Sequence, residues 1–346
     1  MADELRDMIT ISRCGVVLEP DLSDEREVEG VLNPAVAGDY LLYRAVGKGN
    51  YSRIMAAQLA PASNPQTCPV ARKLNRVVLE PHEPYELSST GRGGIEDPRV
   101  TRLSDGTFVM FYTGYGRPAG FRIQTPLVAA AVSANGLDWH RLGRLTFSSH
   151  VHAGQEIDFN KFPNKDTVLF SEKIGGRYAM LHRPMFTHSQ AKSFGIPRRS
   201  IWYAEADVLT GPWSNHALLV TPTYDWEHGG VGAGVPPIHL QDRWVHVYHG
   251  FRQREEGGRR YRYSAGVFVT PHREPKQIVF RSGVALLEPS RESEITGTVP
   301  HVVFPTAVWE AEITPDNSLT IFWGAADTRI MSGTLSLPST MLESNV

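Results

Sequence analysis

Short apolar runs, each framed by glycine, proline or charged residues, recur along the whole chain, and long stretches with helical spacing are hard to find. The runs hold four or five apolar or aromatic residues, and the 31 glycines and 24 prolines are spread between them. Short strands bounded by turn residues are typical of all-β proteins. The pattern therefore predicts an all-β fold.

One of these runs occurs five times, at intervals of about 70 residues. The copies read GDYLLYRAVG, GTFVMFYTGYG, GRYAMLHRP, DRWVHVYHGF and SLTIFWGAAD. Their alignment places five ring-bearing residues in register: Tyr43, Tyr112, His182, Tyr248 and Trp323. A unit of this length has room for four strands and their loops.

The repeat predicts a single five-bladed β-propeller over residues 1–346, with its active site in the central axial funnel. Radial repetition suits sheets because it leaves few strand edges exposed. The terminal segments 1–20 and 335–346 are expected to be peripheral. The alternative is a pair of β-sandwiches in which the spacing is accidental.

Composition narrows the class of partner. The formal net charge is −2, the isoelectric point is near 6.7, and 41% of the residues are hydrophobic. These values predict neither nucleic acid nor a membrane as a partner, since polyphosphate binding needs a concentrated basic face. The start of the chain has no apolar core of a secretory signal, so we expect a cytoplasmic monomer or simple homo-oligomer. Cys14 and Cys68 are expected to be small buried thiols.

The stretch GGIEDPRV, residues 93–100, places Glu96 and Asp97 before a proline and just ahead of the second copy of the run. We interpret the repeated run as the innermost strand of each blade, so the residues that follow the aligned rings, among them Arg44, Arg183 and His249, are expected near the central channel. Carboxylates and cations gathered in one funnel suggest an anionic or polyhydroxylated ligand. The alternative for Asp97 is a turn residue that caps backbone amides.

Five sequence blocks carry a resemblance: GGIEDPRV, DGTFVMFYTG, NKDTVLFSEKIGGRYAMLHRP, VGAGVPPIHLQDRWVHVYHG and FWGAAD. In this order, over about residues 30 to 330, they resemble the β-mannoside phosphorylase family, glycoside hydrolase family 130. The resemblance implies a five-bladed propeller and inverting phosphorolysis of β-mannosides, which releases α-mannose 1-phosphate. Inorganic phosphate would be the co-substrate, manno-oligosaccharide the partner, and no cofactor is implied.

The resemblance also assigns residues. Asp97 matches the general acid, whose pKa burial and the neighbouring Glu96 should raise. The predicted substrate contacts are Asn33, Arg53, Glu96 and Asp327. The predicted phosphate contacts are Lys165, Arg183, His249 and Tyr263, with Tyr261 as a rival for the last position. Taken alone, Asn33 and Asp327 also suit turns, and Arg53 also suits an exposed surface.

One departure weakens the phosphate site. Where phosphorylases of this family tend to carry a lysine, the chain has Gly230. Inverting hydrolysis is therefore the alternative function, with no base assigned among Glu156, Asp158, Glu227, Glu255 and Glu256. A non-catalytic carbohydrate-binding propeller is disfavoured because Asp97 and its flanking residues are intact.

Residues 148–164 form an insertion that carries His150, His152, Glu156 and Asp158. A His-x-His pair on a strand can bind metal, but a solvated loop is the preferred interpretation and no metal site is predicted. We expect the insertion to overhang the channel and to influence which acceptor sugar binds.

Overall fold

The chain folds almost entirely into β-strands, in a computed structural model that describes residues 9–60, 68–88, 91–197, 199–253, 261–309 and 318–338. The predicted all-β class is confirmed. Within these ranges helical structure is confined to short segments: η1 (Phe159–Lys161), α2 (His188–Phe194), η2 (Asp225–Glu227) and α3 (Glu292–Ile295). In this part of the chain no helix is long and apolar enough to cross a bilayer.

The largest sheet consists of two antiparallel groups, which we name after their first strands. The β2 group holds β2 (Gly30–Ala37), β3 (Tyr40–Gly47), β4 (Tyr51–Ala60) and β5 (Val70–Leu79). The β6 group holds β6 (Gly93–Arg102), β7 (Phe108–Gly116), β8 (Thr125–Ser133) and β9 (His140–Arg144). Two residue pairs join the groups, where the start of β4 runs parallel to the start of β6.

Three more antiparallel groups follow along the chain. The β12 group holds β12 (Asn164–Leu169), β13 (Tyr178–Pro184), β14 (Ile201–Ala206) and β15 (Ser214–Val220). The β16 group holds β16 (Gly230–Ala233), β17 (Ile238–Leu240), β18 (Arg243–Gln253), β19 (Tyr261–Pro271) and β20 (Phe280–Arg281). The β21 group holds β21 (Val303–Trp309), β22 (Ser318–Ala325), β23 (Arg329–Ser336) and β1 (Thr10–Leu18).

The N-terminal strand completes the last group. β1 pairs antiparallel with β23, so that Thr10 lies opposite Ser336. β1 is the edge strand of this group, farthest from the innermost strand β21, and the end of β23 pairs with it. Residues 1–8 and 339–346 lie outside the described ranges.

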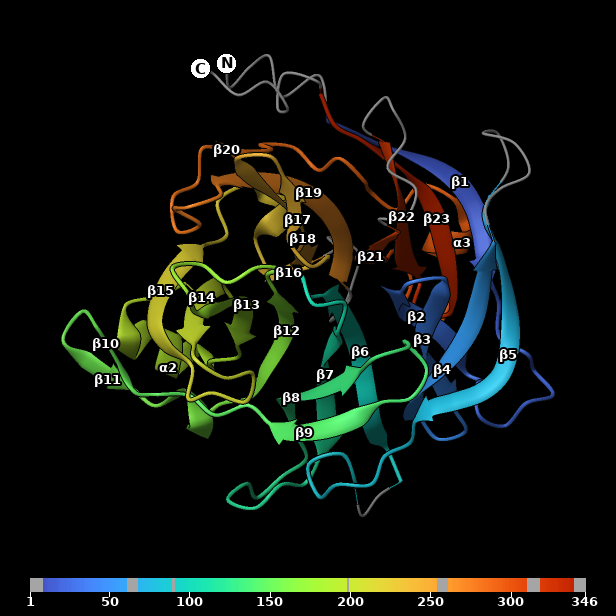
Figure 1. Cartoon of the computed structure of the whole chain (residues 1–346), viewed down its shortest axis with the longest axis horizontal. Helices are drawn as coiled ribbons and strands as arrows, with labels where there is room; N and C mark the ends of the chain where they lie inside the picture. Colours follow the sequence, from blue (N-terminus) through green and yellow to red (C-terminus); the bar gives the residue numbers. More distant parts are fainter. Residues whose placement is uncertain are drawn as a thin grey trace.

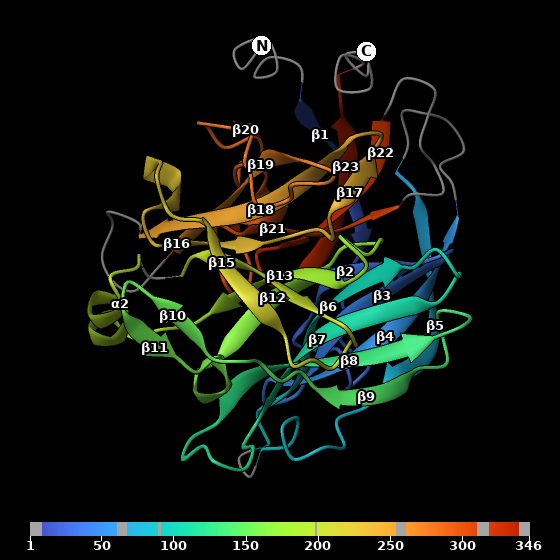
Figure 2. The same ribbon diagram turned by 60° about the vertical axis from the view of Figure 1, so that its left-hand side comes forward.

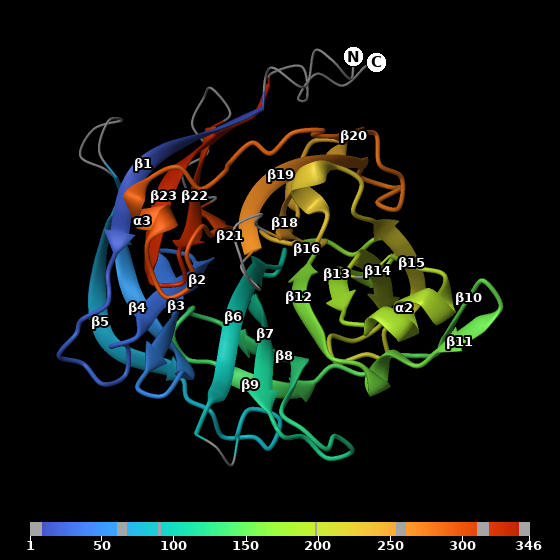
Figure 3. The ribbon, with the colours of Figure 1, turned by 180° about the vertical axis from the view of Figure 1, so that it is seen from behind.

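An apolar core lies between each pair of neighbouring groups, and these cores follow one another in a closed order. Figures 1 and 3 show the groups side by side around a common centre, and Figure 2 shows them from the side. In β7, Phe111 faces the core shared with the β12 group, whereas Tyr112 faces the core shared with the β2 group. Successive strand residues point to opposite faces, and both faces are buried here. The repeated run is for this reason apolar at nearly every position instead of alternating.

The aligned rings lie on the second strand of each group, not on the innermost one. Tyr43 is in β3 and Tyr112 in β7, whereas the strands that meet at the centre are β2, β6, β12, β16 and β21. The interpretation of the repeated run as the innermost strand was wrong. As a consequence, Glu96 and Asp97 lie within β6 and not in a loop before an inner strand.

A buried glutamate ties a turn to the sheets in four of the groups. These glutamates are Glu27, Glu86, Glu227 and Glu294, each at most 1% exposed. Each accepts backbone N–H groups from the turn before it and pairs with a cation: Lys73, Arg141, Arg281 and Arg13, respectively. In three groups the same carboxylate accepts the hydroxyl of the aligned tyrosine, at 2.5 to 3.0 Å. The aligned tyrosines are therefore conserved within the repeat as hydrogen-bond donors as well as core residues.

The two cysteines form a disulfide. Cys14, on β1, is joined to Cys68, which precedes β5. Cys14 is exposed and Cys68 half-buried, so the prediction of two small buried thiols was wrong. The bond connects the β21 group to the β2 group, and only the folded arrangement reveals it because 54 residues separate the two positions.

Candidate active site

Bulges in the innermost strands present three polar side chains. The pairing register shifts between Leu32 and Ala35 in β2, between Glu96 and Arg99 in β6, and between Lys165 and Val168 in β12. The bulged residues Asn33, Asp97 and Asp166 have φ of 46°, 52° and 52°. Asparagine and aspartate tolerate this left-handed conformation better than other side chains, and a bulge turns a side chain away from the pleat. Asp97, the acidic residue before Pro98, thus lies in a bulge of β6 that turns its side chain away from the pleat.

Asp97 lies in a buried network with three predicted site residues. Asn33 Nδ2 donates to Asp97 Oδ1 at 2.7 Å, and Arg44 Nη1 donates to the same oxygen at 3.2 Å. Glu96 lies beside it and accepts from Arg44 Nη2 at 2.8 Å and from Lys165 Nζ at 3.3 Å. Asp97 and Glu96 are 7% and 3% exposed. Arg44 joins the two carboxylates, and the sequence noted it only as the residue after an aligned ring.

Two glycines leave the space that these side chains need. A Cβ on Gly324 would come 2.3 Å from Asn33 Oδ1, and a Cβ on Gly232 would come 2.3 Å from Asp166 Oδ2. Real Cβ atoms do not approach oxygen so closely, so a side chain at either position would displace the polar group. The neighbouring strands therefore help to fix Asn33 and Asp166.

The pKa of Asp97 is shifted opposite to the expected direction. Burial alone raises the pKa of its carboxyl, but the charges of Arg44, Lys165 and Arg99 and the Asn33 hydrogen bond outweigh burial and hold the pKa well below its usual range. Asp97 is therefore ionised in the unliganded site. The expectation of a raised pKa overlooked the surrounding cations.

Asp327 has the opposite shift. Burial, together with the charges of Asp97 and Glu96, raises the pKa of Asp327 to about 6 against the opposing effect of Arg44 and Lys165. These charges place Asp327 in the same cluster as Asp97, after the end of β22 and at φ 47°. The cluster thus holds two carboxyls whose pKa values are shifted in opposite directions.

The predicted phosphate residues gather around Asp166. Arg183 Nε donates to Asp166 Oδ2 at 2.5 Å, and His249 Nε2 lies 3.5 Å from the same oxygen. Burial lowers the pKa of His249 to about 3, with Arg183 and Arg99 adding to the shift and Asp166 opposing it. His249 is therefore neutral, and the expectation that it adds positive charge was wrong. Asp166 was missed, although the NKDT block aligns it with Asp97 and Asn33 as the bulge of its strand.

Arg99 is the second cation that the sequence did not assign. Its guanidinium is 2% exposed, and it donates from Nε to the Gly234 carbonyl at 2.6 Å and from Nη1 to the Asp97 carbonyl at 3.1 Å. Asp97 and Asp166 both stabilise its charge, which burial and Arg183 destabilise. Arg99 links the Asp97 and Asp166 halves of the cluster.

The structure separates the two rival tyrosines. The charges of Arg183 and Asp327 act on the Tyr263 hydroxyl, whose pKa burial raises. Its ring stacks on Phe251 at 4.9 Å. Tyr261 packs instead on the outer side of Phe251, beneath the guanidinium of Arg199. Tyr263 is thus the tyrosine of this cluster.

Arg53 is not brought into the cluster. Its guanidinium binds Glu80 at 2.9 and 3.3 Å and the Arg26 carbonyl at 3.0 Å, and it lies over the Tyr51 ring. These contacts hold it on the outer part of β4. Nine site residues were predicted. Within the described part of the chain, Arg53 contacts none of the other eight.

Gly230 cannot simply be exchanged for lysine. A Cβ at this position would lie 2.5 Å from Arg199 Cβ and 3.0 Å from the Phe251 ring, and its φ is +138°. The Arg199 guanidinium lies over Phe251 at 5.0 Å, and its charge acts on Tyr263. A different cation therefore stands close to the position from which the family's lysine would project.

Two cavities flank the cluster. One, of about 780 Å³, lies between the β12 and β16 groups and is lined by Arg199, Tyr224, His228, Arg252 and Tyr261 among others. The second, of about 350 Å³, is lined by residues that follow the bulges on the innermost strands, including Val36, Val100 and Val308. Polar groups thus occupy the bulges, and mostly apolar groups line the second cavity beyond them.

The insertion at residues 148–164 does not reach this cluster. It forms a hairpin of β10 (His150–His152) and β11 (Gln155–Ile157) followed by η1, and Figures 1 and 3 show the hairpin at the outer edge of the β12 group. The expectation that it overhangs the channel was wrong. His150 packs on Trp202 and Phe159, while Asp158 caps η1, so these residues form no common ligand set.

The site balances its own charges. Its cations are Arg44, Arg99, Lys165 and Arg183, and its carboxylates are Glu96, Asp97, Asp166 and Asp327. Planar amide, guanidinium and carboxylate groups of this kind form directional hydrogen bonds to sugar hydroxyls, and guanidinium groups also bind phosphate. With Asp327 protonated, the cluster carries one net positive charge and can take up an anion.

Comparisons with known proteins agree with this chemistry. The model of glycoside hydrolase family 130, described as beta-1,4-mannooligosaccharide phosphorylase, matches residues 17–341. A 1,2-beta-oligomannan phosphorylase of Thermoanaerobacter sp. is 30% identical over 322 residues, which are 91% of this chain and 92% of the relative. A beta-1,4-mannooligosaccharide phosphorylase of Ruminococcus albus is 28% identical over 256 residues, 73% of this chain and 66% of the relative.

Solved structures share the fold. The beta-1,2-mannobiose phosphorylase of Listeria innocua, in complex with beta-1,2-mannobiose, aligns with a TM-score of 0.66 at 21% identity and covers 96% of this chain and 98% of its own. Sequence and structure together define the class of protein as an enzyme that acts on glycosidic bonds, a glycoside phosphorylase or hydrolase. Within that class, the chain belongs to glycoside hydrolase family 130.

Proposed function

We propose that the protein cleaves β-mannosidic bonds of manno-oligosaccharides by inverting phosphorolysis and releases α-mannose 1-phosphate. The C1–O bond to the leaving sugar breaks, a phosphate oxygen bonds to C1 from the opposite face, and the leaving oxygen takes one proton. The observation that carries the proposal is the buried Asp97 beside the cations Arg44, Lys165 and Arg99, with Arg183 at Asp166 in the same cluster. Inorganic phosphate is the co-substrate, and several relatives are phosphorylases.

Asp97 is the proposed proton donor, acting on the leaving oxygen directly or through a mannose hydroxyl. In the unliganded site its pKa is low because of the surrounding cations. A phosphate dianion bound to Lys165 and Arg183 offsets these charges and leaves burial as the main influence, which raises the pKa. Phosphate binding and protonation of Asp97 are then coupled, so the acid gains its proton when the nucleophile is present.

The remaining roles follow from the contacts. Asn33, Glu96 and Asp327 are the proposed ligands of the mannose hydroxyls. Lys165, Arg183 and Tyr263 are the proposed phosphate ligands, with neutral His249 as a hydrogen-bond donor. Arg183 donates from Nε to Asp166, which leaves its two Nη groups for the phosphate oxygens. Arg53 has no role in this proposal because Glu80 holds it elsewhere.

Inverting hydrolysis is the second candidate, and Asp166 is the specific observation in its favour. This carboxylate occupies the place among Arg183, Lys165 and His249 where phosphate would bind. Inverting hydrolases use such a carboxylate as a base that activates water. Asp166 is the proposed base for this alternative; of the five acids considered from sequence, Glu255 and Glu256 lie outside the described residues.

The proposed architecture is the five-bladed propeller, with each of the five groups as one blade. Its support is the closed order of the cores and the gathering of β2, β6, β12, β16 and β21 at the centre.

The test is incubation with β-1,2- and β-1,4-manno-oligosaccharides, with and without inorganic phosphate. We expect α-mannose 1-phosphate only in the presence of phosphate, and a loss of about 10²–10⁴-fold in kcat for Asp97→Asn. Asp166→Asn separates the two functions: it should leave phosphorolysis measurable but abolish hydrolysis. Free mannose formed at equal rates with and without phosphate would contradict phosphorolysis. Near wild-type activity of Asp97→Asn would contradict the assignment of the acid.

A further inference from the structure

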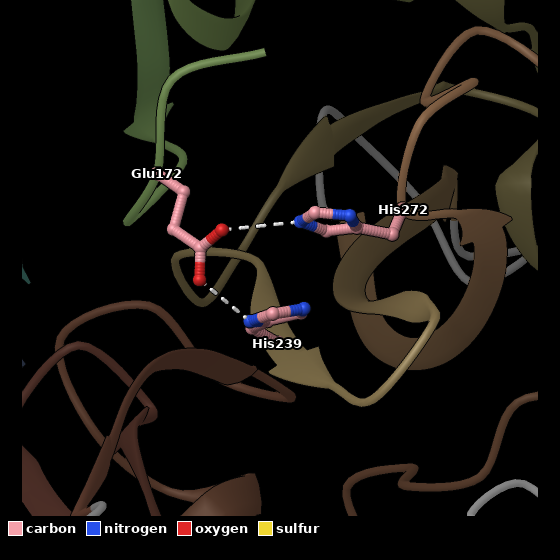
Figure 4. A group of neighbouring side chains, drawn as sticks. All are labelled: Glu172, His239 and His272. Atoms are coloured by element: carbon pink, nitrogen blue, oxygen red, sulfur yellow. Dashed lines mark hydrogen bonds and ion pairs between the residues drawn. The ribbon is translucent and has the colours of Figure 1, made fainter.

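Two histidines and a glutamate from neighbouring groups meet outside the active-site cluster. Glu172 lies in the turn between β12 and β13, His239 lies in β17, and His272 directly follows β19 (Figure 4). His239 Nδ1 lies 2.9 Å from Glu172 Oε1, and His272 Nε2 lies 3.2 Å from Glu172 Oε2. One ligand atom of each residue lies within 4.8 Å of the other two. The carboxylate thus faces two imidazole nitrogens across the boundary between the β12 and β16 groups.

The backbone fixes the protonation of His239. Its Nε2 lies 2.8 Å from the Gln241 carbonyl, which can only accept, so Nε2 carries the hydrogen. In the neutral ring, Nδ1 then presents a lone pair to a carboxylate oxygen. Two acceptors at 2.9 Å repel each other unless a cation lies between them. A metal ion bound by Nδ1 and the carboxylate oxygen removes this repulsion.

Aromatic packing holds the two imidazole rings in place. The rings of His239 and His272 stack with centroids 4.4 Å apart, and Trp244 lies within 4.7 and 5.3 Å of them. Trp244 Nε1 also donates to the His272 carbonyl at 3.1 Å, which positions that residue before any ligand binds.

We propose that Glu172, His239 and His272 bind a divalent transition metal, with Zn²⁺ as the best match. Two imidazoles and one carboxylate are a well-attested zinc ligand set, and a water molecule completes the tetrahedron. The bond from His239 Nε2–H to a carbonyl is the second interaction that metal-binding histidines usually make. The ligand side chains are 43%, 29% and 28% exposed, so an ion can enter from solvent.

The bound ion acts as a cross-link between the β12 and β16 groups. Glu172 belongs to the first and both histidines to the second, so metal binding adds to the apolar contacts of their shared core. The site is structural in this proposal and is independent of which reaction the active-site cluster performs. The sequence predicts no metal site because these three residues stand in separate blocks and meet only in the folded chain.

The test uses full-length, tag-free protein stripped with a chelator and dialysed. Titration with Zn²⁺ should give one equivalent bound, and saturation at about 100 times Kd should raise Tm by about 5 °C. Addition of Co²⁺ should produce the visible absorption of a tetrahedral site. Glu172→Gln and His272→Ala should each remove the Tm rise and weaken binding at least about 100-fold.

His82→Ala is the matched control, since His82 and Glu83 form an exposed pair at 3.3 Å without a third ligand. It should bind Zn²⁺ like the wild type. Glu172→Gln keeps the shape of the side chain at a half-exposed position, so its folding can be checked by circular dichroism. Absence of stoichiometric binding to the wild type, or an unchanged Tm rise in Glu172→Gln, would overturn the proposal.

Discussion

Asp97 and Asp327 belong to one cluster, yet their environments shift their pKa values in opposite directions. Three cations and an amide stabilise ionised Asp97, whereas burial among carboxylates raises the pKa of Asp327 to about 6. Carboxyls whose environments separate their pKa values in this way are typical of catalytic sites. Asp327 is therefore a residue at which a substitution should increase stability and reduce activity.

Asp327→Asn should stabilise the protein near pH 7.5 while reducing its activity. The folded-state pKa lies above the unfolded value of about 3.9, so the stability that this carboxyl contributes is present below pH 4 and lost as pH rises through 6. Removing the ionisable group should recover about 2 kcal/mol at pH 7.5 and almost nothing at pH 4. Urea unfolding at the two pH values measures the difference.

The exposed Asp207→Asn serves as a control and should leave the urea unfolding midpoint unchanged at both pH values. An equal stabilisation of Asp327→Asn at both pH values would show that the effect is not one of ionisation.

At the scale of the elements, polar groups inside the sheets decide the geometry as much as the apolar cores do. Bulges at Asn33, Asp97 and Asp166 direct side chains to the centre. The buried glutamates fix the turns at the other end of the groups. Glu227 alone accepts hydrogen bonds from the amides of Thr223 and Tyr224, from the Tyr248 hydroxyl and from Arg281.

Glu227→Gln should lower the free energy of unfolding by about 2–4 kcal/mol. The amide replaces an acceptor oxygen with a donor and leaves the buried Arg281 without its counter-ion. Chemical denaturation checks the value, and the exposed Glu156→Gln is the matched control. If Glu227→Gln lowers the free energy of unfolding no more than Glu156→Gln does, the hydrogen-bond network of Glu227 contributes little to stability.

At the scale of the whole molecule, four buried histidines lie in the β12 and β16 groups, and of these His249 lies beside a carboxylate, that of Asp166. Burial lowers the pKa of His216 to about 4 and of His246 and His249 to about 3, and lowers that of His182 well below its usual value. These four residues lie in the β12 and β16 groups. Unfolding exposes these imidazoles to water, where they bind protons in acid. Low pH therefore favours the unfolded state.

The protein should lose stability steadily from about pH 6.5 downwards. The folded pKa values lie below the unfolded value of about 6.5, so the stability is fully present above pH 6.5 and lost as pH falls towards 3 to 4. Each histidine should cost about 2 kcal/mol by pH 5. Urea midpoints between pH 8 and 5 measure the trend, and the exposed His82→Ala variant should follow the wild type. A midpoint independent of pH over this range would contradict the prediction.

The sequence by itself determined the all-β class and the five-fold repeat, because strand patterning and turn chemistry are local properties. Asp97, Asn33, Lys165 and Arg183 were assigned by the resemblance of ordered sequence blocks to glycoside hydrolase family 130. Tertiary structure alone decided which strand is innermost, since every strand of the run is buried on both faces. It also decided the low pKa of Asp97 and the roles of Arg44 and Asp166. Charges, metal ligands and the Cys14–Cys68 bond depend on distances between residues far apart in the chain, which no local pattern contains.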